Sequence, residues 1–240
     1  MAVPDWQTGI VTRIEQATHN TRRYWIQMPA TDNFNFKSGQ FVTLDLPIHE
    51  QKNKRWRSYS IASAPDGTNT IELVIVWLEG GAGTTYLFNE IKEGSELTLR
   101  GPQGVFTLHD EVEHDLFMIC TGTGIAPFRS MVNYIKAHNV PHKKLHLIFG
   151  TRHKADLLYE DEMRALMAEM PNFTYHPVLS REQLDGYRNG YVHTVYEELC
   201  AGAPPADFML CGWKVMIDEA KQRLLGMGYD KKSIHLELYG

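Results

Sequence analysis

The second half of the sequence alternates short apolar runs with helical segments, and this alternation restricts the possible folds more than any other feature. The apolar runs are residues 116–120, 145–149, 173–178, 208–211 and 234–238. Each run is continuous, as in a strand that is buried on both faces of a sheet. Helices are predicted between them at residues 127–138, 156–170, 191–200 and 214–227. Strands that alternate with helices form a helix-covered parallel sheet, so we predict a five-stranded parallel α/β domain.

Residues 1–110 show a different pattern, in which short strands are separated by turn residues. We predict strands at residues 8–18, 21–28, 41–46, 57–60, 70–77 and 96–100, and one short helix at residues 84–91. Short strands joined by glycine-containing turns are typical of an antiparallel Greek-key barrel. The sequence therefore predicts a barrel domain over residues 1–110 and the α/β domain over residues 111–240, with the boundary near residues 108–114.

The composition argues against several classes of protein. The net charge is −5, so the chain has no general attraction for nucleic acid or anionic lipid. The N-terminus lacks a basic segment followed by an apolar run, and no apolar stretch approaches the ~20 residues of a membrane helix, so we expect neither a signal peptide nor a membrane span. Three scattered cysteines favour a reducing cytoplasm over a disulfide framework. They lack iron–sulfur spacing and the histidines lack a metal-binding pattern, so we expect no metal in this chain.

Two segments of the predicted barrel carry side chains suited to a phosphate and an aromatic ring. In Arg57-Ser58-Tyr59-Ser60, an arginine can bind a phosphate, a tyrosine can cover a ring and a hydroxyl can reach a ring nitrogen. In Gly81-Ala82-Gly83-Thr84, small residues open a short helix whose N–H groups can bind phosphate, with Thr84 as N-cap or phosphate contact. An ordinary strand and a plain glycine loop are the alternative interpretations.

A second phosphate-binding pattern follows the first apolar run of the α/β domain. Thr121-Gly122-Thr123-Gly124 lies between a predicted buried strand and a predicted helix. Glycines there allow the backbone to approach a nucleotide, and the N-terminus of the helix favours phosphate. A tight structural turn is the alternative.

Residues at the ends of the next two strands bear on the choice of nucleotide. Arg152 follows the second strand, and Ser180 and Arg181 follow the third, at the edge where open α/β sheets bind their ligands. A 2′-phosphate needs a charged fork and a hydroxyl donor, which Arg181 and Ser180 supply. Arg188 can assist and Tyr191 can stack on adenine, unless these arginines only solvate a loop.

The fourth strand of the α/β domain ends in Cys211-Gly212, and the chain ends in Glu237-Leu238-Tyr239-Gly240. A cysteine at a strand end can be a small core residue, and a chain end can be a frayed tail. The apolar pattern before Glu237 argues against a frayed tail.

In this order, the motifs resemble those of the ferredoxin–NADP reductase superfamily of flavoproteins. The superfamily pairs an Arg-x-Tyr-Ser motif with a downstream Gly-x-x-Ser/Thr motif, and plant-type members end in an acidic residue, one spacer and an aromatic residue. The extra Gly240 departs from the members that end at the aromatic residue itself. The resemblance implies hydride transfer between a nicotinamide and FAD in an active site between the two domains, although some relatives hold FMN.

The resemblance also implies roles for individual residues. Ser60, Cys211 and Glu237 surround the point where the nicotinamide meets the flavin, and Tyr239 covers the flavin face that the nicotinamide must occupy. The implied FAD contacts are Arg57, Ser58, Tyr59, Ser60, Ile75, Val76, Gly81, Ala82, Gly83, Thr84, Thr123 and Tyr239. The implied NADP contacts are Thr121, Gly122, Gly124, Arg152, Ser180, Arg181, Arg188, Tyr191, Cys211 and Gly212.

The resemblance favours NADPH as the electron donor and a ferredoxin or flavodoxin as a separate one-electron acceptor. The acceptor would dock near Lys52, Lys54 and Arg55, which can equally be a solvated loop. One alternative is an NADH-driven reductase component of an oxygenase or desaturase, which would be insensitive to Arg181→Ala. Another is a flavin-bearing electron-transfer subunit without nicotinamide turnover of its own, which would be insensitive to Glu237→Ala.

Overall fold

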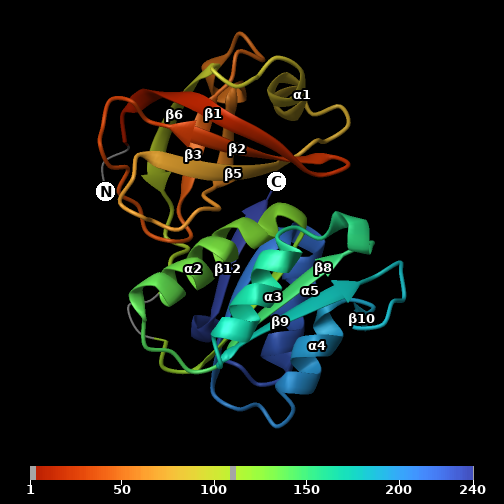
Figure 1. Cartoon of the computed structure of the whole chain (residues 1–240). Helices are drawn as coiled ribbons and strands as arrows, with labels where there is room; N and C mark the ends of the chain where they lie inside the picture. The colour runs from red at the N-terminus through yellow and green to blue at the C-terminus, as the bar shows by residue number, and fades with distance from the viewer. Residues whose placement is uncertain (1–3, 109–111, 240) are drawn as a thin grey trace. The chain divides into compact units, whose positions relative to one another are not determined.

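The computed structural model describes residues 4–108 and 112–239, and the chain divides into two compact units (Figure 1). The first, the barrel unit, comprises Met1–Leu108 together with Arg129–Tyr134. The second, the α/β unit, comprises His109–Phe128 and Ile135–Gly240. The predicted boundary between residues 110 and 111 lies outside the described residues. Each unit has its own sheet and its own core.

The barrel unit is built on a six-stranded antiparallel sheet with the strand order β4-β3-β6-β1-β2-β5. Its elements are β1 (Trp6–Thr18), β2 (Thr21–Gln27), β3 (Phe41–Asp45), the 3-10 turn η1 (Lys52–Lys54), β4 (Trp56–Ser60), β5 (Thr70–Val76), α1 (Ala82–Asn89) and β6 (Glu96–Gln103). An isolated antiparallel bridge between Ile61 and Leu73 joins the chain after β4 to β5, the two edge strands. The sheet thereby curls into a barrel, as predicted.

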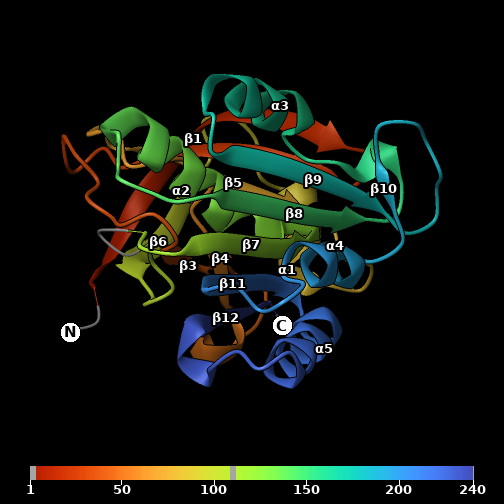
Figure 2. The same cartoon turned by 90° about the horizontal axis from the view of Figure 1, so that it is seen from below.

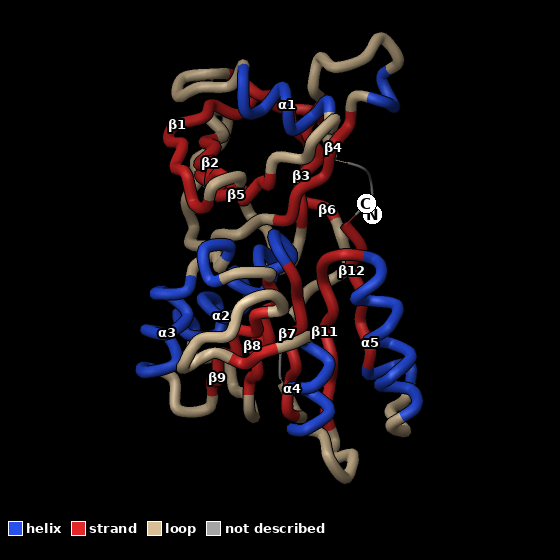
Figure 3. Tube along the Cα trace, turned by 90° about the vertical axis from the view of Figure 1, so that its right-hand side faces the viewer, coloured by secondary structure: helices blue, strands red, loops and turns tan. Residues whose placement is uncertain are grey.

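Alternate residues of these strands point inward and form the core of the barrel unit. Val42, Leu44, Leu73 and Leu99 are among the fully buried residues. Helix α1 packs on this core through Leu87, whose carbonyl accepts a hydrogen bond from the buried Tyr24 hydroxyl at 3.1 Å. Figure 3 shows α1 as a short helix beside the barrel strands. The core therefore fixes α1 relative to the strands that carry the Arg57–Ser60 motif.

The α/β unit contains a parallel sheet with the strand order β10-β9-β8-β7-β11-β12 (Figure 2). Its elements are β7 (Asp115–Thr121), η2 (Gly122–Gly124), α2 (Ile125–His138), β8 (Leu145–Thr151), η3 (Lys154–Asp156), α3 (Glu160–Glu169), β9 (Phe173–Leu179), β10 (Arg188–Asn189), α4 (Val192–Leu199), β11 (Ala206–Trp213), α5 (Lys214–Gly226), η4 (Lys231–Ser233) and β12 (Ile234–Tyr239). Because the strands are parallel, the loops that follow β7, β8, β9 and β11 lie at the same edge of the sheet.

Both faces of this sheet are covered, which explains why its strands are apolar throughout. Phe117, Ile119, Phe208 and Leu210 face a core shared with α4 and α5. The residues between them, such as Cys120 and Met209, are also buried. In Figure 1, α2 and α3 lie in front of the sheet. None of the described helices is long and apolar enough to span a membrane.

The structure corrects the expected sheet and one expected helix. The sheet has six strands instead of five, because Arg188 and Asn189 pair with Val178 and Leu179 as the short strand β10. The helix predicted to start at residue 156 starts at Glu160. Residues 154–156 instead form η3, which the side chains of His153 and Asp156 close with a reciprocal capping box. The two polar side chains satisfy the turn locally, so a continuous helix does not form there.

Candidate functional site

The Arg57 side chain lies across the first turn of helix α1. Arg57 Nη1 donates to the carbonyls of Lys54 at 3.1 Å and Trp56 at 2.8 Å. A Cβ atom placed on Gly83 would lie 3.0 Å from Arg57 Cγ and 3.1 Å from Arg57 Nε. Because Gly83 has no side chain, the Arg57 side chain can lie in the space that a Cβ atom would otherwise restrict. Strand β4 and helix α1, about 25 residues apart in the chain, jointly build this arrangement.

The N-terminus of α1 fits a phosphate group. Gly81 is the N-cap and carries no side chain to satisfy the first N–H groups of the helix. Thr84 is therefore not the N-cap, and its hydroxyl binds instead to the Gly81 carbonyl at 3.1 Å and the Leu78 carbonyl at 3.3 Å. A positive helix end beside a guanidinium is suited to a dinucleotide pyrophosphate. The residues present here therefore fit FAD.

Strand β4 presents its remaining motif residues on alternate faces. Tyr59 packs against the barrel core, and burial raises the pKa of its phenol, so the ring stays neutral. Ser60 is only 4% exposed and pairs with Phe41 of β3. Ser58 is exposed, and its hydroxyl lies 3.0 Å from that of Thr43. In β5, Ile75 is a core residue and Val76 is half-buried at the strand end.

In the α/β unit, the loop Thr121–Gly124 packs tightly against the end of β11. A Cβ atom on Gly124 would lie 2.4 Å from the Cys211 carbonyl oxygen. A Cβ atom on Gly212, whose φ is +139°, would lie 2.5 Å from Thr121 Oγ1. Gly122 has a φ of +55°, which favours glycine. Only glycines allow these two chain segments to meet.

This packing leaves the N-terminus of α2 without a side-chain cap. Gly124 is the N-cap of α2, and Thr121, Gly122 and Thr123 are all half-buried. The positive end of a helix with a glycine-rich approach fits the pyrophosphate of a nicotinamide nucleotide.

The loops after β8 and β9 are joined by backbone hydrogen bonds. Ser180 donates to the Thr151 carbonyl from its amide at 2.9 Å and from its hydroxyl at 3.2 Å. The amide of Arg181 donates to the carbonyl of Arg152 at 3.0 Å. The structure therefore brings the backbones of two exposed arginines together at the edge where such sheets bind ligands.

Two other residues of the predicted nucleotide site lie further along the chain. Arg188 is engaged by the carboxylate of Glu198, with N···O distances of 2.6 and 3.2 Å. The Tyr191 side chain is 71% exposed, directly before α4.

A pocket beside β10 is lined by Tyr175, His176, Pro177, Gly186, Tyr187 and Arg188. Among the described residues, no group of three or more His, Cys, Asp or Glu side chains is arranged to hold a metal ion.

The last strand places Glu237 and Tyr239 beside the end of β11. Cys211 pairs in register with Glu237, and its thiol lies 3.9 Å from Glu237 Oε2. Burial, reinforced by the Glu237 carboxylate, raises the pKa of the Cys211 thiol well above its usual value, while Tyr239 opposes this shift. The thiol therefore stays protonated and acts as a hydrogen-bond donor, not as a nucleophile. Gly240 lies outside the described residues.

Trp213 is a further candidate site residue that was not predicted from the sequence. Its side chain is 60% exposed, and its indole Nε1 lies 3.9 Å from the position of a Cβ on Gly122. Its amide lies 3.4 Å from Thr121 Oγ1. An aromatic side chain directly after Cys-Gly, at the ligand-binding edge of a parallel sheet, is the signal that identifies it.

Comparisons with known proteins agree with this division of the chain. The oxidoreductase FAD-binding domain family matches residues 8–108, and the oxidoreductase NAD-binding domain family matches residues 118–222. A relative from Sorangium cellulosum, described as ferredoxin–NADP reductase B, is 35% identical and covers 86% of each chain. The chain is also 29% identical to the toluate 1,2-dioxygenase electron transfer component of Pseudomonas putida, over 95% of this chain and 66% of that protein.

Solved structures share the whole two-domain fold. A ferredoxin–NADP⁺ reductase from Neisseria gonorrhoeae with bound FAD and NADP superposes with a TM-score of 0.82 at 25% identity, over 97% of this chain and 98% of that chain. A cytochrome P450 reductase from Amycolatopsis has a TM-score of 0.87 at 25% identity, over 99% of this chain and 71% of that chain.

An FAD-binding barrel followed by an NAD(P)-binding α/β domain defines a flavoprotein oxidoreductase that transfers electrons. Within that class, the chain belongs to the ferredoxin–NADP reductase family, as its motifs indicated.

Proposed function

We propose that this protein is an FAD-dependent oxidoreductase that takes hydride from NADPH and passes single electrons to a separate ferredoxin or flavodoxin. The observation that carries the choice of NADPH is the pairing of the loops after β8 and β9, in which the Arg181 amide binds the Arg152 carbonyl. Two guanidiniums on neighbouring loops suit the 2′-phosphate, and the Ser180 hydroxyl would exchange the Thr151 carbonyl for the phosphate. The similarity to a ferredoxin–NADP reductase supports the same choice.

In this proposal, residues 1–110 bind the flavin and residues 111–240 bind the nicotinamide nucleotide. Arg57 and the amides at the start of α1 hold the FAD pyrophosphate, and Tyr59 lies against the ring system. The loop Thr121–Gly124 and the N-terminus of α2 hold the pyrophosphate of NADPH. FMN has no pyrophosphate to place at the N-terminus of α1, so the arrangement favours FAD.

When bound, the flavin supplies the exchange between a two-electron hydride donor and one-electron acceptors. Ser60 offers its hydroxyl to the reacting end of the ring and is held nearly free of water by burial. The protonated Cys211 fills the space beside the nicotinamide site and donates toward Glu237. The Glu237 carboxylate favours the positive charge that develops on the oxidised nicotinamide. Tyr239 must move for the nicotinamide to enter.

A reductase component of an oxygenase, driven by NADH, is the second candidate. It is favoured by the similarity to the toluate and anthranilate dioxygenase components, of whose lengths the chain spans 66% and 61%. It is also favoured by the Arg188–Glu198 ion pair, because a carboxylate beside Arg188 competes with a 2′-phosphate.

Anaerobic titration of the purified protein with each nucleotide, followed by the visible absorbance of the flavin, tests the proposal. Rapid bleaching by NADPH and slow bleaching by NADH would support it. Equal or faster bleaching by NADH would move the function to the oxygenase-type reductase. A protein that neither contains nor takes up FAD would refute the flavin site itself.

The variant Glu237→Ala separates both candidates from a flavin-bearing subunit without nicotinamide turnover. If nicotinamide is the substrate, flavin reduction should slow in this variant while flavin content is unchanged. A variant with unaltered electron transfer would point to the subunit.

A cytoplasmic location also belongs to the proposal, because all three cysteines are unpaired and buried.

A further inference from the structure

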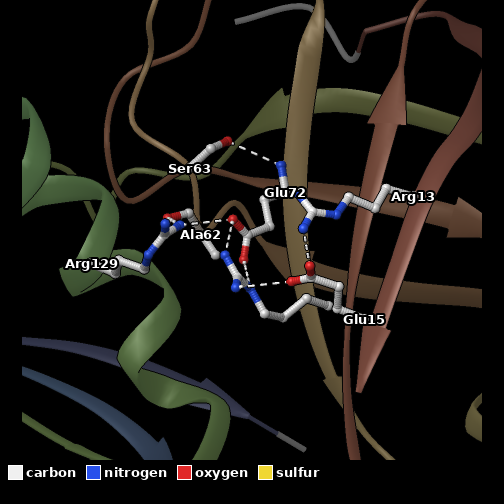
Figure 4. A network of polar contacts seen from close by, with 7 residues as sticks. Arg13, Glu15, Ala62, Ser63, Glu72 and Arg129 are labelled. Atoms are coloured by element: carbon white, nitrogen blue, oxygen red, sulfur yellow. Dashed lines mark hydrogen bonds and ion pairs between the residues drawn. The ribbon is translucent and has the colours of Figure 1, made fainter. Parts of the chain in front are cut away.

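Glu72 is a carboxylate buried in the middle of strand β5, and two arginines from distant parts of the chain bind it (Figure 4). Its side chain is 3% exposed. Arg23 of β2 donates from Nε to Oε1 at 2.6 Å and from Nη2 to Oε2 at 3.1 Å. Arg129 of α2 donates from Nη1 to Oε2 at 2.9 Å. A buried charge is strongly unfavourable unless it is paired in this way, so the three side chains have defined positions.

The same residue, Glu72, also binds the backbone that follows Ser60. The amide of Ala62 donates to the Glu72 carbonyl at 2.8 Å, and the amide of Glu72 donates to the Ser63 hydroxyl at 3.0 Å. Ile61 forms the bridge to Leu73 that closes the barrel. The first three residues after Ser60 are therefore all attached to strand β5 at or beside Glu72.

Arg129 joins the two sets of contacts. Its Nη1 atom donates both to Glu72 Oε2 and to the carbonyl of Ala62, each at 2.9 Å. One nitrogen thus locks the orientation of the Ala62 peptide to a carboxylate that is itself held by Arg23. Arg13 and Glu15 extend the network on its exposed side: Arg13 pairs with Glu15, which accepts from Arg23 at 3.3 Å (Figure 4).

The geometry points to Glu72 and Arg129 as positioning residues for hydride transfer, which hold the Ser60–Ala62 backbone and thereby the Ser60 hydroxyl in its reactive orientation. This inference rests on the proposed function, because it assigns Ser60 to the reacting end of the flavin. Neither residue touches the cofactor in this scheme. Their effect is transmitted through the carbonyl of Ala62, two residues after Ser60. Misplacement of a reacting group by about 1 Å can slow a reaction by about 100-fold.

The variant Arg129→Met tests this inference, because it removes the donor to Ala62 but leaves Glu72 paired with Arg23. The matched control is Arg13→Met, which removes a cation of the same network that has no role at Ala62. We expect the limiting rate of flavin reduction at saturating nucleotide to fall by about 10-fold or more in Arg129→Met only. The dissociation constant of the nucleotide and the flavin content should stay within about 2-fold of the parent.

A second readout does not depend on activity. Amide hydrogen exchange of the FAD-loaded protein should become faster at residues 61–63 in Arg129→Met and stay unchanged in Arg13→Met. Arg129→Lys, which keeps the charge and one donor, should recover part of the rate. An unchanged limiting rate in Arg129→Met, or a rate that falls only in proportion to lost flavin, would overturn the inference. If the parent protein is not reduced by either nucleotide, the proposed function fails instead.

Discussion

Gly83 is the residue whose replacement tests the flavin site most selectively. In Gly83→Ala, the new methyl group would lie 3.0 Å from Arg57 Cγ and would push the arginine off the first turn of α1. Alanine is the better helix former, so stability should be unchanged or higher by up to about 1 kcal/mol. FAD binding should weaken by roughly 10-fold because the guanidinium moves away from the pyrophosphate.

The control for this prediction is Gly226→Ala at the end of α5, where the added methyl group meets nothing within 4 Å. Measuring the dissociation constant of FAD by fluorescence in both variants checks it. Equal FAD affinity in Gly83→Ala and the parent protein would show that Arg57 does not hold the pyrophosphate.

Arg181 and Arg188 differ in what already binds them, and this difference yields a second prediction. The Arg188 guanidinium forms an ion pair with Glu198. Arg181 is exposed, and its backbone amide donates to the Arg152 carbonyl. In Arg181→Ala, we expect NADPH to bind about 10- to 100-fold more weakly, since a charge-assisted contact to phosphate contributes about 1.5–3 kcal/mol. NADH binding should not change, because NADH lacks the 2′-phosphate.

In the matched variant Arg188→Ala, NADPH affinity should change by about 3-fold or less, because an exposed ion pair with Glu198 competes for the guanidinium. Nucleotide titration of both variants under anaerobic conditions distinguishes them. A larger loss in Arg188→Ala than in Arg181→Ala would reverse the proposed roles of the two residues.

Single residues were predictable where their chemistry is local. Gly122 and Gly124 could be identified because close backbone approach requires glycine, and the structure shows that approach. The phosphate-binding role of the Arg57–Ser60 motif stays a prediction. Trp213 was missed although its place directly after Cys211-Gly212 indicates it, and the Arg188–Glu198 pair was missed because the two residues lie on different elements, ten positions apart. Thr84 was predicted as an N-cap or a phosphate contact; Gly81 is the N-cap, and the Thr84 hydroxyl donates to carbonyls of the preceding turn.

At the scale of elements, the turn η1 is the proposed docking site for the acceptor. Lys52 and Lys54 are exposed on η1, whereas Arg55 forms an ion pair with Asp45 at 2.8 Å. We therefore expect the double variant Lys52→Glu, Lys54→Glu to slow electron transfer to an acidic ferredoxin by about 10-fold at low ionic strength. The difference should disappear at high salt, and flavin reduction by NADPH should be unaffected.

The turn η4 in the α/β unit provides the matched control, because Lys231 and Lys232 are exposed there in a similar 3-10 turn. The measurement is the rate of ferredoxin reduction over a range of salt concentrations. If the double charge reversal on η4 has the same effect as that on η1, only the net charge matters and η1 is not the docking site.

The spacing of apolar residues predicted which segments form helices and which form strands, but it did not predict every boundary. All the strands and helices expected from the sequence are present, because a period of two and a period of 3.6 bury different sets of residues. Strand β10 was missed because two exposed residues carry no pattern, and its pairing with Val178 and Leu179 is a property of the sheet. The late start of α3 follows from the side-chain bonds of η3, which compete with the helix.

At the scale of the whole molecule, the change of period near residue 115 predicted two units but not how α2 is divided. Residues 129–134 of this helix belong to the barrel unit, where Arg129 binds Glu72 and the Ser130 carbonyl accepts from Ser38 at 3.2 Å. Contacts between positions 57 and 92 residues apart leave no trace in local pattern. The sequence therefore predicts which elements form and not which distant side chains join them.

Two buried histidines and one half-buried histidine of the α/β unit make the stability of the molecule depend on pH. Burial lowers the pKa of His146, His176 and His193, and for His176 the value falls to about 4, with the neighbouring His146 and Arg188 adding to the effect. His146 Nδ1 lies 3.3 Å from His176 Nε2. In the unfolded chain these side chains take up protons near pH 6.5.

Between about pH 6.5 and about pH 4, the unfolded state thus binds more protons than the folded state, so stability is full above this window and falls as the pH decreases through it. For His176 the loss at pH 5 is about 1 kcal/mol after allowance for its partial exposure. His176→Gln should reduce the loss by that amount. Urea unfolding at about pH 7 and pH 5, followed by circular dichroism, measures the loss in the variant and in the parent protein. Identical pH dependence in His176→Gln and the parent protein would mean that His176 takes up its proton as readily in the folded protein as in the unfolded chain, and that the acid sensitivity arises elsewhere.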